Sequence, residues 1–301
     1  MTCRVAVIMS TYNGQLYINQ QISSFLHQKD VEIDIYIRDD GSKDLTVSLI
    51  RHLQQNHSNI YLYTGDNLGY KKSFLRLLTM VPNTYDYYAF SDQDDVWLDN
   101  KIQKACKKMQ QSSIALYCSA LTYVDDKLSF IRQRDYSIND IGLEKTFARM
   151  RFAGCTMVFT KGLFEIAVSI LKKDSDNVLV SHDLFILSLC EAVKGEIFLD
   201  ENSYILYRRT QSNLTAGGSS ALQRIGYEYK RITTNDRLDL LAKALLKNKI
   251  YAFDTKHYLE SVSKYRTDIW SRINLIISVI KLRYNWILKA EAIIKIMIST
   301  F

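Results

Sequence analysis

Two pairs of closely spaced carboxylates stand out in the N-terminal third of the chain. Asp39 and Asp40 follow one short apolar run, and Asp92 and Asp94 follow another. Like charges this close together cost free energy unless a cation or hydrogen bonds offset them. Asp92 and Asp94 therefore suggest a divalent cation with oxygen ligands, Mg²⁺ or Mn²⁺. Because such an ion usually completes its coordination with phosphate oxygens, a nucleotide is the partner that this site favours.

These carboxylates fall where an α/β sheet would bind a ligand. Apolar runs and helical patterns alternate through the first half, which predicts a mostly parallel, Rossmann-like sheet with helices on both faces. In such sheets, ligands bind beyond the carboxyl ends of the strands. The first half has predicted strands at residues 4–8, 32–38, 60–63, 87–90 and 114–118 and predicted helices at 17–26, 73–80 and 100–111. A further helix begins at a cap, Ser42 or Asp44, and Leu45, Leu49 and Leu53 are predicted to face inward from it. The second half has predicted strands at 155–160 and 204–208, helices at 163–171 and 182–193, a loop at 212–220 and helices after Leu222.

Three common catalytic or nucleotide-binding motifs do not occur in the sequence: GxGxxG, GxxxxGK[ST] and GxSxG. Their absence disfavours a dinucleotide-dependent dehydrogenase, a P-loop NTPase and an α/β-hydrolase.

Four short motifs follow the predicted strands in order. They are Ser-Thr-Tyr-Asn-Gly at 10–14, Arg-Asp-Asp-Gly-Ser at 38–42, Asn-Leu-Gly at 67–69 and Ser-Asp-Gln-Asp-Asp-Val-Trp at 91–97. Taken together, they resemble the family 2 glycosyltransferases with the GT-A fold. The motif at 91–97 is most similar to the bacterial rhamnosyltransferase-like branch that builds cell-surface polysaccharides. The match continues through Ala-Gly-Cys-Thr at 153–156, Ser-His-Asp at 181–183 and Tyr-Arg at 207–208, so that it covers about residues 3–215.

The resemblance implies a GT-A catalytic domain at residues 1–220 and a helical, basic region at 221–301. It also implies an inverting, metal-dependent glycosyltransferase in which Asp183 is the general base that deprotonates the acceptor hydroxyl. Asp92 and Asp94 match the DxD element and would bind Mg²⁺ or Mn²⁺, with Asp94 as the preferred ligand and Asp95 in support. The donor, a nucleotide-diphosphate sugar, would contact Thr11, Tyr12, Asp39, Asp40, Asn67, Gly69, Asp92 and Arg208.

The branch suggests dTDP-L-rhamnose as the donor, with a UDP-hexose as the alternative, and a glycan or lipid-linked glycan as the acceptor. Many relatives carry a His two residues after the Tyr-Arg pair, but Thr210 stands there in this chain. Metal ligation from that side is therefore in question, and Arg209 is a candidate electrostatic substitute. Two other functions stay open: a catalytically inactive nucleotide-sugar-binding subunit of a polysaccharide assembly complex, and a metal-dependent nucleotide hydrolase.

Several of these residues also have purely structural explanations. Asp39-Asp40-Gly-Ser suits a turn and a helix start. Asp92–Asp95 is compatible with a solvated loop or a cap, and Asp183 with the first turn of a helix, where an acid suits the helix dipole. Asn67 and Gly69 are compatible with a simple turn. Trp97 and the five scattered cysteines are expected in the core.

Composition and charge restrict the partners and the compartment. The 301 residues carry a net charge of +7, and 47% of them are apolar, as in a chain that buries a sizeable core. The five cysteines form no CxxC pair, and we see neither a signal peptide nor an apolar stretch long enough to span a membrane. We therefore expect a cytoplasmic protein.

The C-terminal segment carries the whole excess of positive charge. Eleven Lys or Arg and four Asp or Glu lie between Lys243 and Phe301. One apolar stripe is predicted on a final helix, made of Ile273, Ile276, Ile277, Ile280, Tyr284, Ile287 and Leu288. Basic side chains beside such a stripe suit peripheral contact with the inner face of the cell membrane. Packing against the catalytic domain or a second subunit, as in a homodimer, is the alternative. No nucleic-acid-binding pattern accompanies the charge, which disfavours a nucleic-acid partner.

Overall fold

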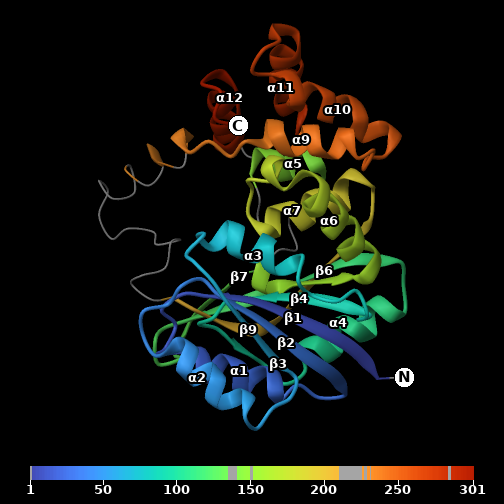
Figure 1. Ribbon diagram of the computed structural model, residues 1–301. Coiled ribbons are helices and arrows are strands. Elements are labelled where there is room, and N and C mark those ends of the chain that lie inside the picture. Colours follow the sequence, from blue (N-terminus) through green and yellow to red (C-terminus); the bar gives the residue numbers. More distant parts are fainter. Residues whose placement is uncertain are drawn as a thin grey trace.

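A nine-stranded sheet forms the centre of the molecule, with helices on both faces (Figure 1). The computed structural model describes residues 2–134, 141–149, 152–209, 226, 229–230, 232–283 and 286–301. The strand order along the sheet is β3-β2-β1-β4-β8-β6-β9-β5, and β7 pairs with β6 outside this path. The α/β, GT-A-like architecture with C-terminal helices that the sequence predicts is confirmed.

The first four strands are parallel, as predicted. They are β1 (Cys3–Thr11), β2 (Val31–Asp39), β3 (Ile60–Thr64) and β4 (Tyr87–Ser91). In register, Thr11 lies opposite Asp39, and Met9 opposite Ser91. Because the strands point the same way, the polar residues that follow them gather at one edge of the sheet.

The remaining strands make the sheet mixed rather than mostly parallel. β8 (Met157–Thr160) is antiparallel to both of its neighbours, β4 and β6 (Ile114–Val124), whereas β9 (Glu196–Arg208) runs parallel to β6. The short strands β5 (Val96–Trp97) and β7 (Phe130–Arg134) pair antiparallel with β9 and β6. Neither was predicted, because β5 has only two residues and β7 is mostly exposed and lacks the alternation of a half-buried strand.

Alternating side chains of β1 belong to two hydrophobic clusters, one on each face of the sheet. Val5, Val7 and Met9 pack with the helices α1 (Ile18–Leu26), α2 (Thr46–Gln54) and α4 (Lys101–Gln110). Ala6 and Ile8 belong to the other cluster, which lies under α3 (Tyr70–Leu78), α5 (Leu143–Ala148), α6 (Lys161–Asp174) and α7 (His182–Ala192). Short 3₁₀ turns lie at Gly154–Thr156 and Ser175–Asn177.

Predictions for individual core residues are mostly confirmed. Trp97 is 2% exposed, and all five cysteines are buried and form no disulfide. Leu45 is an exception: it precedes the first residue of α2 and is exposed, not inward-facing.

Four helices follow in the C-terminal region: α9 (Leu238–Lys247), α10 (Phe253–Lys264), α11 (Ile269–Lys281) and α12 (Trp286–Met297). The prediction of one stripe on a single final helix is wrong, because the helix ends after Lys281 and a second one begins at Trp286. Buried residues of this region, such as Leu241, Leu259 and Ile296, belong to the same cluster as those of α3 and α7. No helix in the described part of the chain has both the length and the apolar character needed to span a bilayer.

Candidate active site

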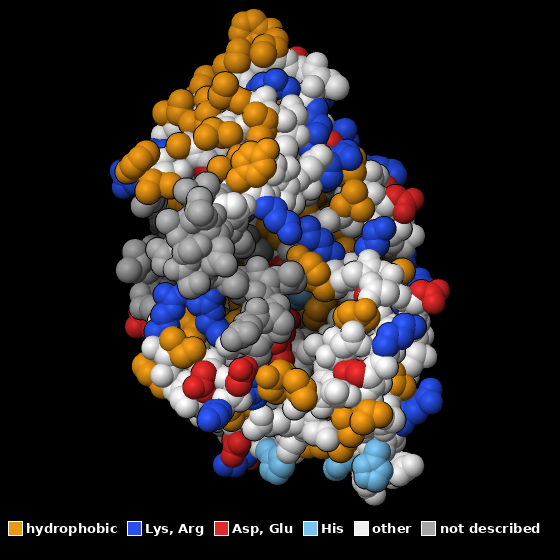
Figure 2. All heavy atoms as spheres, turned by 90° about the vertical axis from the view of Figure 1, so that its left-hand side faces the viewer, with side chains coloured by type: hydrophobic (Ala, Val, Ile, Leu, Met, Phe, Trp, Pro, Cys, Tyr) orange, Lys and Arg blue, Asp and Glu red, His pale blue; other side chains and the backbone are white. Residues whose placement is uncertain are grey.

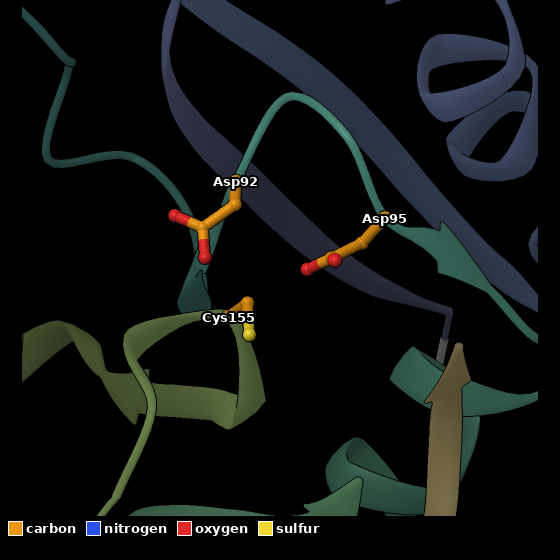
Figure 3. A group of neighbouring side chains, drawn as sticks. All are labelled: Asp92, Asp95 and Cys155. Atoms are coloured by element: carbon orange, nitrogen blue, oxygen red, sulfur yellow. The ribbon is translucent and has the colours of Figure 1, made fainter. Parts of the chain in front are cut away.

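The loop after β4 concentrates negative charge at the edge of the sheet. Asp92, Asp94 and Asp95 occupy this loop, and Asp95 is 1% exposed. Carboxylate oxygens of Asp92 and Asp95 and the Sγ of Cys155 all lie within 4.8 Å of one another. Figure 3 shows the two aspartates on the loop and Cys155 on the neighbouring 3₁₀ turn, around a shared space. The loop therefore presents at least two carboxyl groups to one small volume.

The pKa values of the three carboxyl groups are raised. Burial, followed by the charges of Asp94 and Asp183, raises the pKa of Asp92 to about 7. Burial also raises the pKa of Asp94, against an opposing effect of Arg208. For Asp95, burial and then the charge of Asp92 raise the pKa well above its usual value. A cluster of carboxyl groups with raised pKa values is a place where a bound cation would be stabilising.

The type of ligand atom, carboxylate oxygen or thiol sulfur, decides which metal ions fit this site. Asp92 and Asp94 offer the hard oxygen ligands that Mg²⁺ and Mn²⁺ prefer. Cys155 fits these ions poorly, because burial raises the pKa of its thiol well above the usual value and keeps it protonated. The carboxylate pair that the sequence predicts therefore suits Mg²⁺ or Mn²⁺ better than the Asp92-Asp95-Cys155 group does.

Arg208, at the end of β9, braces the acidic loop. Its side chain is 2% exposed, and its Nε donates to the backbone carbonyl of Asp94 at 2.9 Å. Its backbone amide donates to Oδ1 of Asp95 at 3.1 Å. The other guanidinium nitrogens donate to the carbonyl of Asp126 and to Oε1 of Gln20, both at 2.6 Å. These contacts show Arg208 holding the loop in place, and its predicted contact with the donor stays a prediction.

Asp39, at the end of β2, is buried and fully hydrogen-bonded. It accepts from Oγ1 of Thr11 at 3.1 Å and from the backbone amides of Gly41 and Ser42 at 3.2 and 2.9 Å. Since β2 and β4 flank β1, Asp39 lies two strand spacings from the acidic loop, about 10 Å. That separation suits a ligand that spans from β2 to β4.

Asp40 organises the turn that precedes α3. Its carboxylate, 2% exposed, pairs with Arg38 and accepts from the backbone amides of Leu68 at 2.9 Å and Gly69 at 2.8 Å. Gly69 has φ +78°, a conformation that favours glycine. Asn67 also bonds Gly69, through Oδ1 at 3.1 Å. The structure thus shows a shared turn for these three predicted residues, and their contact with the donor stays a prediction.

Tyr12 is tied directly to the acidic loop. Its backbone amide donates to Oε1 of Gln93 at 2.8 Å, and Nε2 of Gln93 donates back to its carbonyl at 3.1 Å. The Tyr12 side chain is 46% exposed and so is accessible to a ligand. Gln93 lies inside the motif at 91–97, but its role in joining the two loops could not be read from the sequence.

Asp183 belongs to α7, which packs near the acidic loop. It lies in the first turn of that helix, and its charge contributes to the raised pKa of Asp92. A methyl group added at Gly154 would lie 3.2 Å from the Cβ of Asp183 and 2.5 Å from Nε2 of His182. The close packing of the 3₁₀ turn against α7 therefore needs glycine at position 154 and sets the position of Asp183.

His182 packs its ring among apolar side chains and is not placed to act as a metal ligand. It stacks on Phe74 with ring centroids 3.7 Å apart and contacts Phe90 edge-on at 4.5 Å. Neither ring nitrogen has a hydrogen-bond partner among the described residues. Burial lowers the pKa of His182 from 6.5 to about 4, so the ring is neutral near pH 7.

This shift predicts a specific loss of stability in acid. In the unfolded chain His182 binds a proton below about pH 6.5, whereas in the folded protein it binds one only near pH 4. Its contribution to the free energy of unfolding is therefore complete above pH 6.5 and is lost as the pH falls toward 4. The shift corresponds to a contribution on the order of 3 kcal/mol. We expect the free energy of unfolding in urea to fall less between pH 6.5 and 4.5 in His182→Leu than in the wild type. Parallel pH profiles for the two proteins would contradict the assignment.

Tyr70 is a site residue that the sequence motifs did not indicate. It is the first residue of α3, directly after the Asn67–Gly69 turn. The residue is 49% exposed as a whole, but the partial burial of its hydroxyl, followed by the charges of Asp183, Asp236 and Asp92, raises its pKa to about 12. Its position next to a recognised motif was the available signal. Thr210 lies outside the described residues, whereas Arg209 contacts the ring of Tyr123 with its guanidinium 5.1 Å from the centroid.

Comparison with known proteins places this site in context. The model of Glycosyl transferase family 2 matches residues 6–167. The dTDP-rhamnosyl transferase RfbG of Shigella flexneri is 32% identical over 74% of this chain and 78% of its own length. A GalNAc(5)-diNAcBac-PP-undecaprenol beta-1,3-glucosyltransferase of Campylobacter jejuni is 22% identical over 87% of this chain and 80% of its own.

A solved structure shows the same fold. The mannosyltransferase PcManGT of Pyrobaculum calidifontis, in complex with GDP-Man and Mn²⁺, matches all of this chain and 87% of its own, with a TM-score of 0.55 and 16% identity.

Proposed function

The chain belongs to glycosyl transferase family 2 and is a glycosyltransferase, and we propose that it transfers L-rhamnose from dTDP-L-rhamnose to a glycan or lipid-linked glycan, with inversion. The relative RfbG, named as a dTDP-rhamnosyl transferase, supports this donor. A UDP-hexose remains the second candidate. The relative whose name contains PP-undecaprenol supports a lipid-linked acceptor.

One observation carries the proposed chemistry: the 3₁₀ turn at Gly154–Thr156 packs against both the acidic loop and the start of α7. Cys155 lies within 4.8 Å of the carboxylates of Asp92 and Asp95, and a methyl group at the neighbouring Gly154 would lie 3.2 Å from the Cβ of Asp183. Burial, and then the charges of Asp94 and Asp183, raise the pKa of Asp92 accordingly. In our proposal, Asp183 takes the proton from the acceptor hydroxyl as that oxygen attacks the anomeric carbon. Asp92 and Asp94 hold Mg²⁺ or Mn²⁺, which when bound offsets the charge of the leaving diphosphate. The Mn²⁺ complex of PcManGT supports such a cofactor.

The remaining predicted residues would hold the donor. Thr11, Tyr12 and Asp39 lie at the ends of β1 and β2 and would contact the base and the ribose. Asp40 would act through the Asn67–Gly69 turn, and Arg208 through the acidic loop that it braces. Residues 1–220 would form the catalytic domain and 221–301 the helical region; their boundary lies outside the described residues.

We place the protein in the cytoplasm, on the inner face of the cell membrane, where a lipid-linked acceptor would be available. A catalytically inactive nucleotide-sugar-binding subunit and a nucleotide hydrolase are the alternatives. An inactive subunit does not account for the presence of Asp92, Asp94 and Asp183 together. A hydrolase would use the same general base to activate water, so the dependence of turnover on the acceptor separates it from a transferase.

Thermal shift with a panel of nucleotide sugars tests the donor. With Mn²⁺ present, dTDP-L-rhamnose is expected to raise the melting temperature more than UDP-glucose or GDP-mannose, since ligand that binds only the folded state stabilises it. Sugar release is then measured with and without acceptor glycan. Turnover that does not depend on acceptor would identify a hydrolase, and binding without turnover would identify an inactive subunit.

A further inference from the structure

Helix α11 is apolar on two faces, and the described residues cover only one of them. Leu275 and Val279 are buried in the core at 0% and 1% exposure. On the other side, Trp270, Ile273, Ile277 and Ile280 repeat at the three- and four-residue spacing of one helix face, and all four are exposed, with Trp270 at 70%. A globular helix needs only the first of these faces to pack.

Helix α12 extends the uncovered surface. It buries Ala292 and Ile296 and exposes Trp286, Ile294 and Met297, with Trp286 at 74%. Figure 2 shows hydrophobic side chains gathered over the upper part of this face of the molecule, where α11 and α12 lie in Figure 1. We call this surface the α11–α12 patch; it consists of Ile269, Trp270, Ile273, Ile277, Ile280, Trp286, Ile287, Ile294, Met297 and Ile298. An apolar surface of this extent on a folded protein marks an interaction site.

The charges around the patch are mainly positive. Lys281, the last residue of α11, and Arg283, which follows it, are exposed. Of the two acidic residues of the segment, Glu291 is buried and pairs with Arg149, and Asp268 caps the start of α11 through the backbone amide of Ser271. Two exposed tryptophans beside exposed cations match the composition of a surface that rests in the headgroup region of an anionic bilayer.

The patch and the active site open on the same side. The carboxyl ends of β1, β2 and β4 point to the left in Figure 1, which is the side that faces the viewer in Figure 2. An acceptor held in a lipid surface under the patch would therefore approach the edge of the sheet that carries Asp92, next to the start of α7 with Asp183.

We propose that the α11–α12 patch rests on an anionic phospholipid surface and thereby presents the catalytic edge to a lipid-linked acceptor. This inference rests on the proposed function for its acceptor, but the membrane contact itself stands on the patch. Charge favours this partner over a second copy of the chain: an anionic bilayer offers opposite charge to Lys281 and Arg283, whereas the patch of a second copy presents the same cations.

Point variants test the patch without disrupting the core. Deleting residues 269–301 would remove Leu275, Val279 and Ile296 from the hydrophobic core, so a truncated protein would not isolate the surface. Trp270→Glu/Ile277→Glu instead changes two exposed residues. The matched control is Leu45→Glu/Ile131→Glu, which makes the same charge change at two exposed apolar residues of α2's start and of β7.

Co-sedimentation with phosphatidylglycerol-containing vesicles gives the readout. We expect the wild type and the control to sediment, less so at high salt, and the patch variant to partition at least about tenfold more weakly. Equal sedimentation of the patch variant would overturn the proposal. So would a wild-type dimer in solution that fails to sediment and that the patch variant dissociates.

A second readout separates this inference from the proposed function. The patch variant should keep the wild-type thermal shift with dTDP-L-rhamnose and Mn²⁺ and its transfer rate onto a water-soluble acceptor. If no nucleotide sugar stabilises either protein while vesicle binding still depends on the patch, the proposed donor is wrong and the surface assignment survives.

Discussion

Asp183→Asn is expected to lower the rate of sugar transfer by about a thousandfold while donor binding is preserved. General-base catalysis contributes roughly 10²–10⁴ in rate, and asparagine cannot accept the proton from the acceptor hydroxyl. The substitution keeps the side-chain shape beside Gly154, where a methyl group would already lie 3.2 Å from the Cβ of Asp183. Steady-state transfer and thermal shift with the donor, measured side by side, check the two halves of this expectation.

Asp176→Asn provides the matched control. Asp176 is an exposed acid in the 3₁₀ turn that precedes α7, and its substitution removes the same charge nearby. We expect near wild-type transfer from it. If Asp183→Asn were as active as this control, Asp183 would not be the base, and Asp92 would become the next candidate because its pKa is raised to about 7.

The positions of the predicted carboxylates follow from local patterns. The apolar run of each early strand ends in polar residues, and parallel strands necessarily bring those ends together. That is why the sequence alone suffices to assign Asp39 and Asp92 to one edge of the sheet. The mixed second half was harder, because β5 has only two residues and β7, Phe-Ile-Arg-Gln-Arg, lacks the alternation of apolar and polar residues that marks a half-buried strand.

The partners of buried charges could not be predicted, because they are contacts between distant segments. Asp40 pairs with Arg38 and holds the turn at Leu68, and Arg208 reaches Asp94, Asp126 and Gln20. A motif identifies such residues as important, but it does not say whether they touch the ligand or hold the loop that does. The structure shows the second role for both side chains.

The C-terminal helices illustrate a different limit. An apolar stripe on one continuous helix and the same residues on two helices give similar sequence patterns. The break between Lys281 and Trp286 changes which residues share a face. Trp270 and Trp286, which the predicted stripe omitted, are among the most exposed apolar side chains of the α11–α12 patch.

The second large effect is expected from the metal site. Asp94→Asn should abolish the Mn²⁺-dependent rise in melting temperature and reduce transfer by at least about 100-fold, because a Lewis-acid metal supplies several kcal/mol of charge stabilisation. Asp99→Asn is the control, since Asp99 follows the same loop but pairs with Lys29 at the surface, 2.9 Å away. Direct Mn²⁺ binding, followed by calorimetry without any donor, separates loss of the ion from loss of activity.

Retained Mn²⁺ binding in Asp94→Asn, together with its loss in Cys155→Ser, would move the ion to the Asp92-Asp95-Cys155 group. Because a protonated, buried thiol is a poor ligand for a hard cation, we expect the opposite pattern: Cys155→Ser binds Mn²⁺ as the wild type does, and only the carboxylate variant fails.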